Sequence, residues 1–310
     1  MAKVLVCDAM SEGPLNAIRA CPYLELTYNP EVTPEELLTA VKGMDAMVVR
    51  SRTKVTEQVI DAFDTMKLIV RGGVGVDNIK VDYAKSKGVD VKNTPAAASA
   101  SVAELAVGMM FALARKIVPA TGTMLAGQWE KKAFSKGVEL SGKTLGVIGL
   151  GRIGRETAKR GEALGMKVIG YDPYVKASAG TEAHVEDVPL DDLVERSDFI
   201  SLHVPHNDAT HHIINAERLA KMKKSAFLVN CARGGVVDEK ALAEALKAGT
   251  IKGAAIDVYE KEPPLENLFA GMDHVVLAPH IGAQTVEGQE RVGDEVAAVL
   301  KEYFANKAKA

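Results

Sequence analysis

The sequence predicts a protein of the α/β class with two domains, each built around a parallel sheet. In the front third of the 310-residue chain, short apolar runs alternate with amphipathic helical stretches, and the same alternation restarts after Gly142. Continuous apolar runs that are each followed by a helix are typical of βα units with buried strands. The length is sufficient for two domains with separate cores.

The front segment contains four predicted βα units. Thr33 followed by Pro34 is typical of a helix N-cap with proline at the first helical position. The predicted strands are residues 4–10, 45–51, 67–73 and 89–95, and the predicted helices are residues 14–21, 33–43, 56–64 and 81–88.

A long helical stretch from Ser99 to about Trp129 comes next, and we expect a bend near Pro119. Helices separate most of the strands that follow, and a helix over residues 287–306 closes the chain. These later strands are predicted at residues 145–151, 167–172, 198–205, 226–232, 253–258 and 274–280.

The composition excludes several classes of protein. Apolar residues make up 47% of the chain and charged residues 25%, with a net charge of −3, so we expect no nucleic-acid partner. Three widely spaced cysteines give no disulfide framework and favour a reducing compartment. No secretory signal or membrane span is evident, and we expect a cytoplasmic protein with no membrane partner.

A dinucleotide site is predicted by Gly149, Gly151 and Gly154, which fit G-x-G-x-x-G between a strand and a helix. The first glycine permits the turn, the second allows a pyrophosphate to approach, and the third allows close packing of helix on strand. Asp172 lies 23 residues after Gly149 at the end of the next strand. A carboxylate there accepts from a ribose 2′-hydroxyl and repels a 2′-phosphate, which favours NAD over NADP in a Rossmann-type domain.

Four reactive residues follow later strands: Arg233, Asp257, Glu262 and His280. Ligands of open α/β sheets bind beyond the carboxyl ends of the strands, so these side chains are expected to converge. Arginine can hold a carboxylate and histidine can carry a hydroxyl proton, which suits hydride transfer on a 2-hydroxy or 2-oxo acid. The competing interpretation is structural, with His280 in the fold and Glu262-Pro263 capping a loop.

Other chemistries have weaker support. His211 and His212 lack an acidic or cysteine partner at a ligand interval, so we expect no metal site. No nucleophile elbow is present, and Cys231 is expected to pack against the cofactor rather than to react.

The chain resembles the D-2-hydroxyacid dehydrogenase family over its whole length. The resemblance rests on "VRGGVGVDNI", "NTPAAASASVAEL", "GKTLGVIGLGRIGRE", "NCARGGVVDE", "AAIDVYEKEPP" and "PHIGAQTVE", which occur in family order. It implies a discontinuous, flavodoxin-like substrate domain over residues 1–96 and 284–310. The doubly wound Rossmann domain that binds NAD is then expected over residues 97–283.

The resemblance also implies roles for individual residues. It makes His280 the acid/base, Glu262 its partner and Arg233 the substrate anchor. The residues that it assigns to the cofactor are Val74, Gly149, Gly151, Arg152, Ile153, Gly154, Asp172, Val204, Cys231, Ala232, Arg233, Asp257, His280, Gly282 and Ala283.

Within the family, the chain is similar to the members that oxidise 3-phospho-D-glycerate with NAD in serine biosynthesis. The substrate residues that this implies are Arg50 and Arg71, with Arg52 less firmly matched, and the backbone of Gly72, Gly73 and Val74 as a carboxylate cradle. Many such members carry a serine-binding C-terminal domain, and none is expected here.

The segment around Trp129 resembles a dimer-crossing element, with Lys131 or Lys132 reaching the neighbouring site, so we expect a homodimer through the nucleotide domain. Two other functions stay open. One is reduction of glyoxylate or hydroxypyruvate, and the other is a non-catalytic NAD-sensing corepressor.

Overall fold

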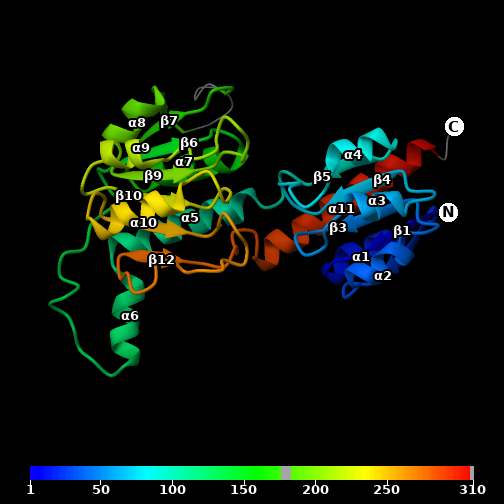
Figure 1. The fold of residues 1–310 in the computed structure, drawn as a ribbon, viewed down its shortest axis with the longest axis horizontal. Coiled ribbons are helices and arrows are strands. Elements are labelled where there is room, and N and C mark those ends of the chain that lie inside the picture. The colour runs from blue at the N-terminus through cyan, green and yellow to red at the C-terminus, as the bar shows by residue number, and fades with distance from the viewer. Residues whose placement is uncertain (176–182, 308–310) are drawn as a thin grey trace. The chain divides into compact units, whose positions relative to one another are not determined.

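The structure is a computed structural model that describes residues 1–175 and 183–307. The chain folds as two compact units (Figure 1). The terminal unit comprises residues 1–98 and 283–310, and the central unit comprises residues 99–282.

The terminal unit is a five-stranded parallel sheet in the order β2-β1-β3-β4-β5, a flavodoxin-like order. Alternate side chains of β1 and of Cys7, the residue after it, pack into two hydrophobic cores. Val4 and Val6 pack with α1 and α11, whereas Leu5 and Cys7 pack with α2, α3 and α4. The elements are β1 (Ala2–Val6), α1 (Glu12–Arg19), β2 (Leu24–Tyr28), α2 (Pro34–Ala40), β3 (Ala46–Val49), α3 (Glu57–Asp61), β4 (Leu68–Arg71), α4 (Val81–Ser86), β5 (Asp90–Asn93) and α11 (Val286–Lys307).

The central unit is a seven-stranded parallel sheet in the order β12-β11-β10-β9-β6-β7-β8, with the strand order of a Rossmann fold. The chain runs outward from β6 through β7 to β8 and then returns to β9 on the other side of β6. The order therefore reverses between β6 and β9, where doubly wound sheets bind their ligands. The elements are α5 (Ser99–Ala114), α6 (Ile117–Leu125), β6 (Thr144–Ile148), α7 (Arg152–Ala163), β7 (Lys167–Tyr171), β8 (Val185–Asp187), α8 (Leu190–Arg196), β9 (Phe199–Leu202), α9 (Ala216–Lys221), β10 (Phe227–Asn230), α10 (Glu239–Lys247), β11 (Gly253–Ile256) and β12 (Val275–Leu277).

The helical stretch after Ser99 differs from the expectation. It breaks at Lys116, whose backbone is left-handed at φ 52°, and not at Pro119, which lies in the first turn of α6. Proline is tolerated there because the first helical N–H groups have no acceptor within the helix. Among the described residues, no helix combines the length and apolar character needed to cross a bilayer.

Candidate active site

The glycine turn after β6 has a geometry that requires glycine at two positions. Gly149 adopts φ 96°, and a Cβ atom there would lie 2.6 Å from the carbonyl oxygen of His203. A Cβ on Gly154 would lie 1.9 Å from the carbonyl oxygen of Gly149, so α7 approaches the turn this closely only because residue 154 is glycine. A Cβ on Gly151 would meet no atom within 4 Å, which leaves open space in front of the turn.

The start of α7 faces this turn. Arg152 and Ile153 are its first residues, and their N–H groups have no acceptor within the helix because a helix N-terminus leaves its first amides unpaired. These amides and the positive end of the helix dipole suit a pyrophosphate.

Asp172 follows β7 and is held beside the same turn. Its Oδ2 accepts the N–H of Leu150 at 2.8 Å, and its Oδ1 accepts those of Tyr174 at 2.8 Å and Val175 at 3.1 Å. The carboxylate is therefore oriented in advance, and its remaining lone pairs can accept from a ribose hydroxyl. Open space at Gly151, free helix amides and a fixed carboxylate together fit NAD.

Other residues assigned to the cofactor form apolar walls at the ends of β9 and β10. Val204, Cys231 and Ala232 are buried, and a γ-carbon of Val204 lies 2.9 Å from the position of a Cβ on Gly149. Burial, with the charge of Asp257 added, raises the pKa of the Cys231 thiol. The neutral thiol contacts Met109, with 3.7 Å between the sulfur atoms, and is not an activated nucleophile.

His280 and Glu262 form a hydrogen-bonded pair. Nδ1 of His280 lies 2.7 Å from Oε2 of Glu262, and the backbone of His280 is left-handed at φ 56°. Burial alone would raise the pKa of Glu262, but hydrogen bonds from His280 and from the Tyr259 amide, with the charges of His280 and Arg233, lower it below its ordinary value. Glu262 is thus kept ionised against the imidazole.

Arg233 follows β10 and completes this group within the central unit. Its Nη1 donates to the carbonyl of Ala232 at 2.6 Å, and its positive charge acts on Glu262. Asn230 fixes the turn between β10 and Arg233, since its side chain accepts from the Ala232 amide at 3.1 Å and donates to the Arg233 carbonyl at 3.2 Å. The structure therefore brings Arg233, Glu262 and His280 together.

Asp257 is buried and supports the turn after His280. Its two carboxylate oxygens accept the N–H groups of Ile281 and Gly282, each at 2.8 Å. Burial raises the pKa of Asp257, and these two amides oppose that shift. Ala283, the next residue of the predicted cofactor set, belongs to the terminal unit, where its carbonyl accepts from the side chain of Gln289.

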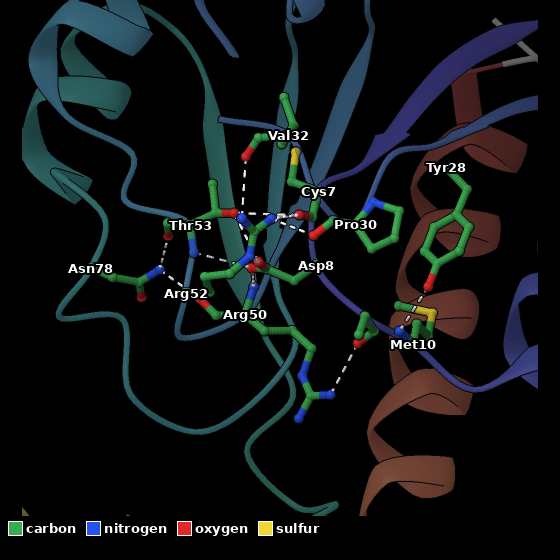
Figure 2. Close-up of polar contacts among 11 residues, drawn as sticks. Cys7, Asp8, Met10, Tyr28, Pro30, Val32, Arg50, Arg52, Thr53 and Asn78 are labelled. Atoms are coloured by element: carbon green, nitrogen blue, oxygen red, sulfur yellow. Dashed lines mark hydrogen bonds and ion pairs between the residues drawn. The ribbon is translucent and has the colours of Figure 1, made fainter. Parts of the chain in front are cut away.

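In the terminal unit, Arg52 is engaged in the fold. Figure 2 shows its guanidinium turned toward the buried Asp8, which it contacts at 3.1 Å, and toward nearby backbone carbonyls. Those carbonyls belong to Cys7, Pro30 and Val32. All three guanidinium nitrogens have partners within the unit, so Arg52 braces the loop after β3.

Arg50 points elsewhere, and its side chain extends away from the contacts of Arg52 (Figure 2). Its Nη1 donates to the carbonyl of Ala9 at 3.1 Å, and its Nε is buried without a partner among the described residues. Burial lowers the pKa of the guanidinium, which the charge of Asp8 opposes. Asn78 holds the backbone here, donating to the carbonyls of Arg50 and Thr53.

Arg50 and Arg71 meet at Gly72 and Gly73. A Cβ on Gly72 would lie 3.3 Å from the Arg50 Cγ, and a Cβ on Gly73, which adopts φ 142°, would lie 1.5 Å from Nη1 of Arg71. Only glycine leaves room for the Arg71 guanidinium at this place, so the two arginines flank one turn.

The predicted carboxylate cradle needs a correction. The Gly72 amide donates to the Val49 carbonyl at 2.8 Å, and the Gly73 amide donates to Oγ1 of Thr94 at 2.6 Å. Both amides are therefore engaged by the sheet and its flanking loop. Of the three predicted amides, only that of Val74 has no partner in the described parts of the chain, and the amide of Gly75 after it shares this property.

Two contacts near the candidate site were not foreseen. His212 lies 3.0 Å from a carboxylate oxygen of Glu260, which supplies the acidic neighbour that sequence spacing did not reveal. Tyr259 contacts the segments of Glu262 and His280. Within the described ranges, no group of three or more His, Cys, Asp or Glu side chains is arranged to hold a metal ion.

Comparison with known proteins shows the family of the chain. Residues 107–282 match the model of the D-isomer specific 2-hydroxyacid dehydrogenase NAD-binding domain. The chain is 50% identical over 302 residues to D-3-phosphoglycerate dehydrogenase of Methanocaldococcus jannaschii. The match covers 97% of this chain but only 57% of the length of that protein. It is 51% identical over 297 residues to hydroxypyruvate reductase of Thermotoga maritima, at 95% of each chain.

A solved structure of D-lactate dehydrogenase from Aquifex aeolicus, complexed with NAD and lactic acid, superposes with a TM-score of 0.85. That match has 32% identity and covers 99% of this chain and 96% of the other. The chain therefore belongs to the D-isomer specific 2-hydroxyacid dehydrogenase family and carries its NAD-binding domain.

Proposed function

We propose that the protein oxidises 3-phospho-D-glycerate to 3-phosphooxypyruvate with NAD, the first step of phosphorylated L-serine biosynthesis. The hydrogen-bonded pair of His280 and Glu262, with Arg233 beside it, carries the dehydrogenase part of this proposal. The two arginines that flank Gly72 and Gly73 carry the phosphate part.

His280 is the proton carrier. Its Nδ1 is occupied by Glu262, whereas its Nε2 has no partner among the described residues and is the atom that takes the proton of the substrate 2-hydroxyl. Glu262 stabilises the imidazolium that results. Arg233 holds the substrate carboxylate or the carbonyl that forms beside it. Bound NAD, held by the glycine turn, α7 and Asp172, supplies the hydride acceptor.

Arg50 and Arg71 are the proposed phosphate ligands. A chain with a net charge of −3 needs local positive charge to hold a trianionic substrate, and two arginines on one turn supply it. The amides of Val74 and Gly75 are the proposed carboxylate donors, because they are open where those of Gly72 and Gly73 are engaged.

A second candidate is reduction of hydroxypyruvate or glyoxylate. The observation that favours it is the Thermotoga maritima hydroxypyruvate reductase, which matches this chain over nearly all of both lengths. The two candidates share the chemistry of His280, Glu262 and Arg233 and differ in whether the substrate carries a phosphate.

We also propose a homodimer through the central unit. The segment from Ile117 to Trp129 exposes an apolar surface that includes Leu125 at 85% and Trp129 at 77% exposure, followed by the exposed Lys131 and Lys132. Large aromatic side chains are frequent anchors of protein interfaces. Light scattering of the wild type and Trp129→Ala tests this, since the variant is expected to shift toward monomer.

A substrate panel tests the catalytic proposal. With NADH, the panel contains 3-phosphooxypyruvate, hydroxypyruvate and glyoxylate, and with NAD it contains 3-phospho-D-glycerate and D-glycerate. The proposal requires a higher kcat/KM for each phosphorylated compound than for its unphosphorylated analogue. A preference for hydroxypyruvate or glyoxylate selects the second candidate.

A further inference from the structure

His280 stands in a backbone conformation that needs support from its surroundings. Its φ of 56° is left-handed, which costs free energy in a residue with a Cβ atom and persists only where neighbouring contacts impose it. The segment around His280 must therefore be held on both sides.

The segment after His280 is held by Asp257. Its two oxygens accept the amides of Ile281 and Gly282, as described above. The segment before His280 is held by Tyr259, whose hydroxyl donates to the carbonyl of Ala278 at 3.0 Å.

Tyr259 also contacts the segments that carry the other two members of the site. Its backbone N–H donates to Oε1 of Glu262 at 3.1 Å. A Cβ on Gly234, the residue after Arg233, would lie 1.8 Å from the Tyr259 carbonyl oxygen, so the two backbones are in direct contact. One residue thus touches the segments of Arg233, Glu262 and His280.

We propose that Tyr259 is a positioning residue of the dehydrogenase reaction, with its hydroxyl holding the His280 segment so that Nδ1 stays on Glu262. This inference rests on the proposed dehydrogenase function. The two polar groups of Tyr259 act together. Its amide orients the carboxylate of Glu262, and its hydroxyl orients the segment of His280, the residue that hydrogen-bonds to this carboxylate. Without the hydroxyl, His280 keeps its chemistry but samples other positions.

Tyr259→Phe tests the hydroxyl alone, because the ring and the backbone amide remain. Tyr23→Phe is the matched control, since the Tyr23 hydroxyl likewise donates to a backbone carbonyl, that of Lys301 at 3.2 Å in the terminal unit. For Tyr259→Phe we expect kcat to fall about 3- to 10-fold, the effect of one lost hydrogen bond, with KM for NADH within about twofold of wild type. In the pH–rate profile, protonation of Glu262 is expected to move to higher pH, because Glu262 loses part of the hydrogen bond from His280 that lowers its pKa.

A second readout does not depend on turnover. In protein labelled with ¹⁵N-histidine, the ring signals of His280, assigned by their loss in His280→Gln, report the hydrogen bond at Nδ1. We expect these signals to shift or split in Tyr259→Phe and to stay unchanged in Tyr23→Phe. Wild-type kcat, pH profile and ring signals in Tyr259→Phe would overturn the proposal. If the wild type binds NADH but turns over no 2-hydroxy or 2-oxo acid, the proposed function fails, while the ring signals still decide whether Tyr259 holds His280.

Discussion

Nδ1 of His280 lies 2.7 Å from Oε2 of Glu262, across 18 residues of sequence. This contact fixes which ring nitrogen is available, because Glu262 occupies Nδ1 and Nε2 has no partner among the described residues. A carboxylate that also accepts the Tyr259 amide is held in place before any substrate arrives. The pair is therefore arranged for proton transfer at one defined atom.

Replacing His280 tests its proposed role as the proton carrier directly. His280→Asn is expected to lower kcat by about 10²–10⁴-fold, the usual scale for a lost general acid/base, while NADH still binds. Steady-state rates and a fluorescence titration with NADH measure the two effects. An unchanged kcat would remove His280 from the mechanism.

The lowered pKa of Glu262 predicts how the free energy of unfolding depends on pH. A carboxyl group with a depressed pKa in the folded state stabilises the protein above its ordinary pKa, near 4.3, and loses that contribution as the pH falls through the lowered value. Glu262→Gln is therefore expected to be less stable than wild type at pH 7, with a difference that narrows below about pH 4. Urea unfolding from pH 3 to 7 measures it.

Glu25→Gln on the exposed edge strand is the control and is expected to follow wild type throughout. A constant stability difference between wild type and Glu262→Gln at every pH would show that the carboxylate is not linked to folding. The same Glu262 variant is expected to lose kcat on the order of tenfold, less than His280→Asn.

We expect the preference for NAD over NADP to depend on Asp172. Asp172→Ala is expected to weaken NADH binding and to raise the relative affinity for NADPH, because the 2′-hydroxyl acceptor and the repulsion of a 2′-phosphate are lost together. The alanine variant also loses the contacts to Leu150, Tyr174 and Val175. Asp172→Asn, which keeps an acceptor oxygen but no charge, separates the two effects in paired NADH and NADPH titrations. A wild-type preference for NADPH would contradict the role of Asp172.

The sequence predicted every interior strand of the two sheets and two of their four edge strands, β5 and β12. Most of the length of β1, β6 and β10 is apolar because both faces of these strands are covered. The strands β2 (Leu24–Tyr28) and β8 (Val185–Asp187) were not predicted. Each lies at a sheet edge and exposes part of its length, so neither has the apolar run that identifies a buried strand.

For the candidate site, sequence motifs indicated residues at the ends of strands but could not indicate which polar groups were already engaged. The sequence matched Arg52 to the substrate less firmly than Arg50, but it could not indicate that Arg52 braces Asp8. The amides of Gly72 and Gly73 are engaged by Val49 and Thr94, contacts that depend on the register of the sheet and its flanking loop. No sequence motif indicated the proposed positioning role of Tyr259, because that role depends on contacts among the segments of Arg233, Glu262 and His280.

The phosphate assignment depends most directly on Arg71, and the decisive quantity is kcat/KM for 3-phosphooxypyruvate divided by that for hydroxypyruvate. Arg19→Ala, which removes an exposed arginine of α1, is the control and is expected to keep the wild-type ratio. We expect the wild type to favour the phosphorylated compound and Arg71→Ala to lose roughly tenfold to more than a hundredfold of that ratio. This corresponds to one charge-assisted contact of about 1.5–3 kcal/mol. Equal losses on both compounds, or a wild type that favours hydroxypyruvate, would contradict the account.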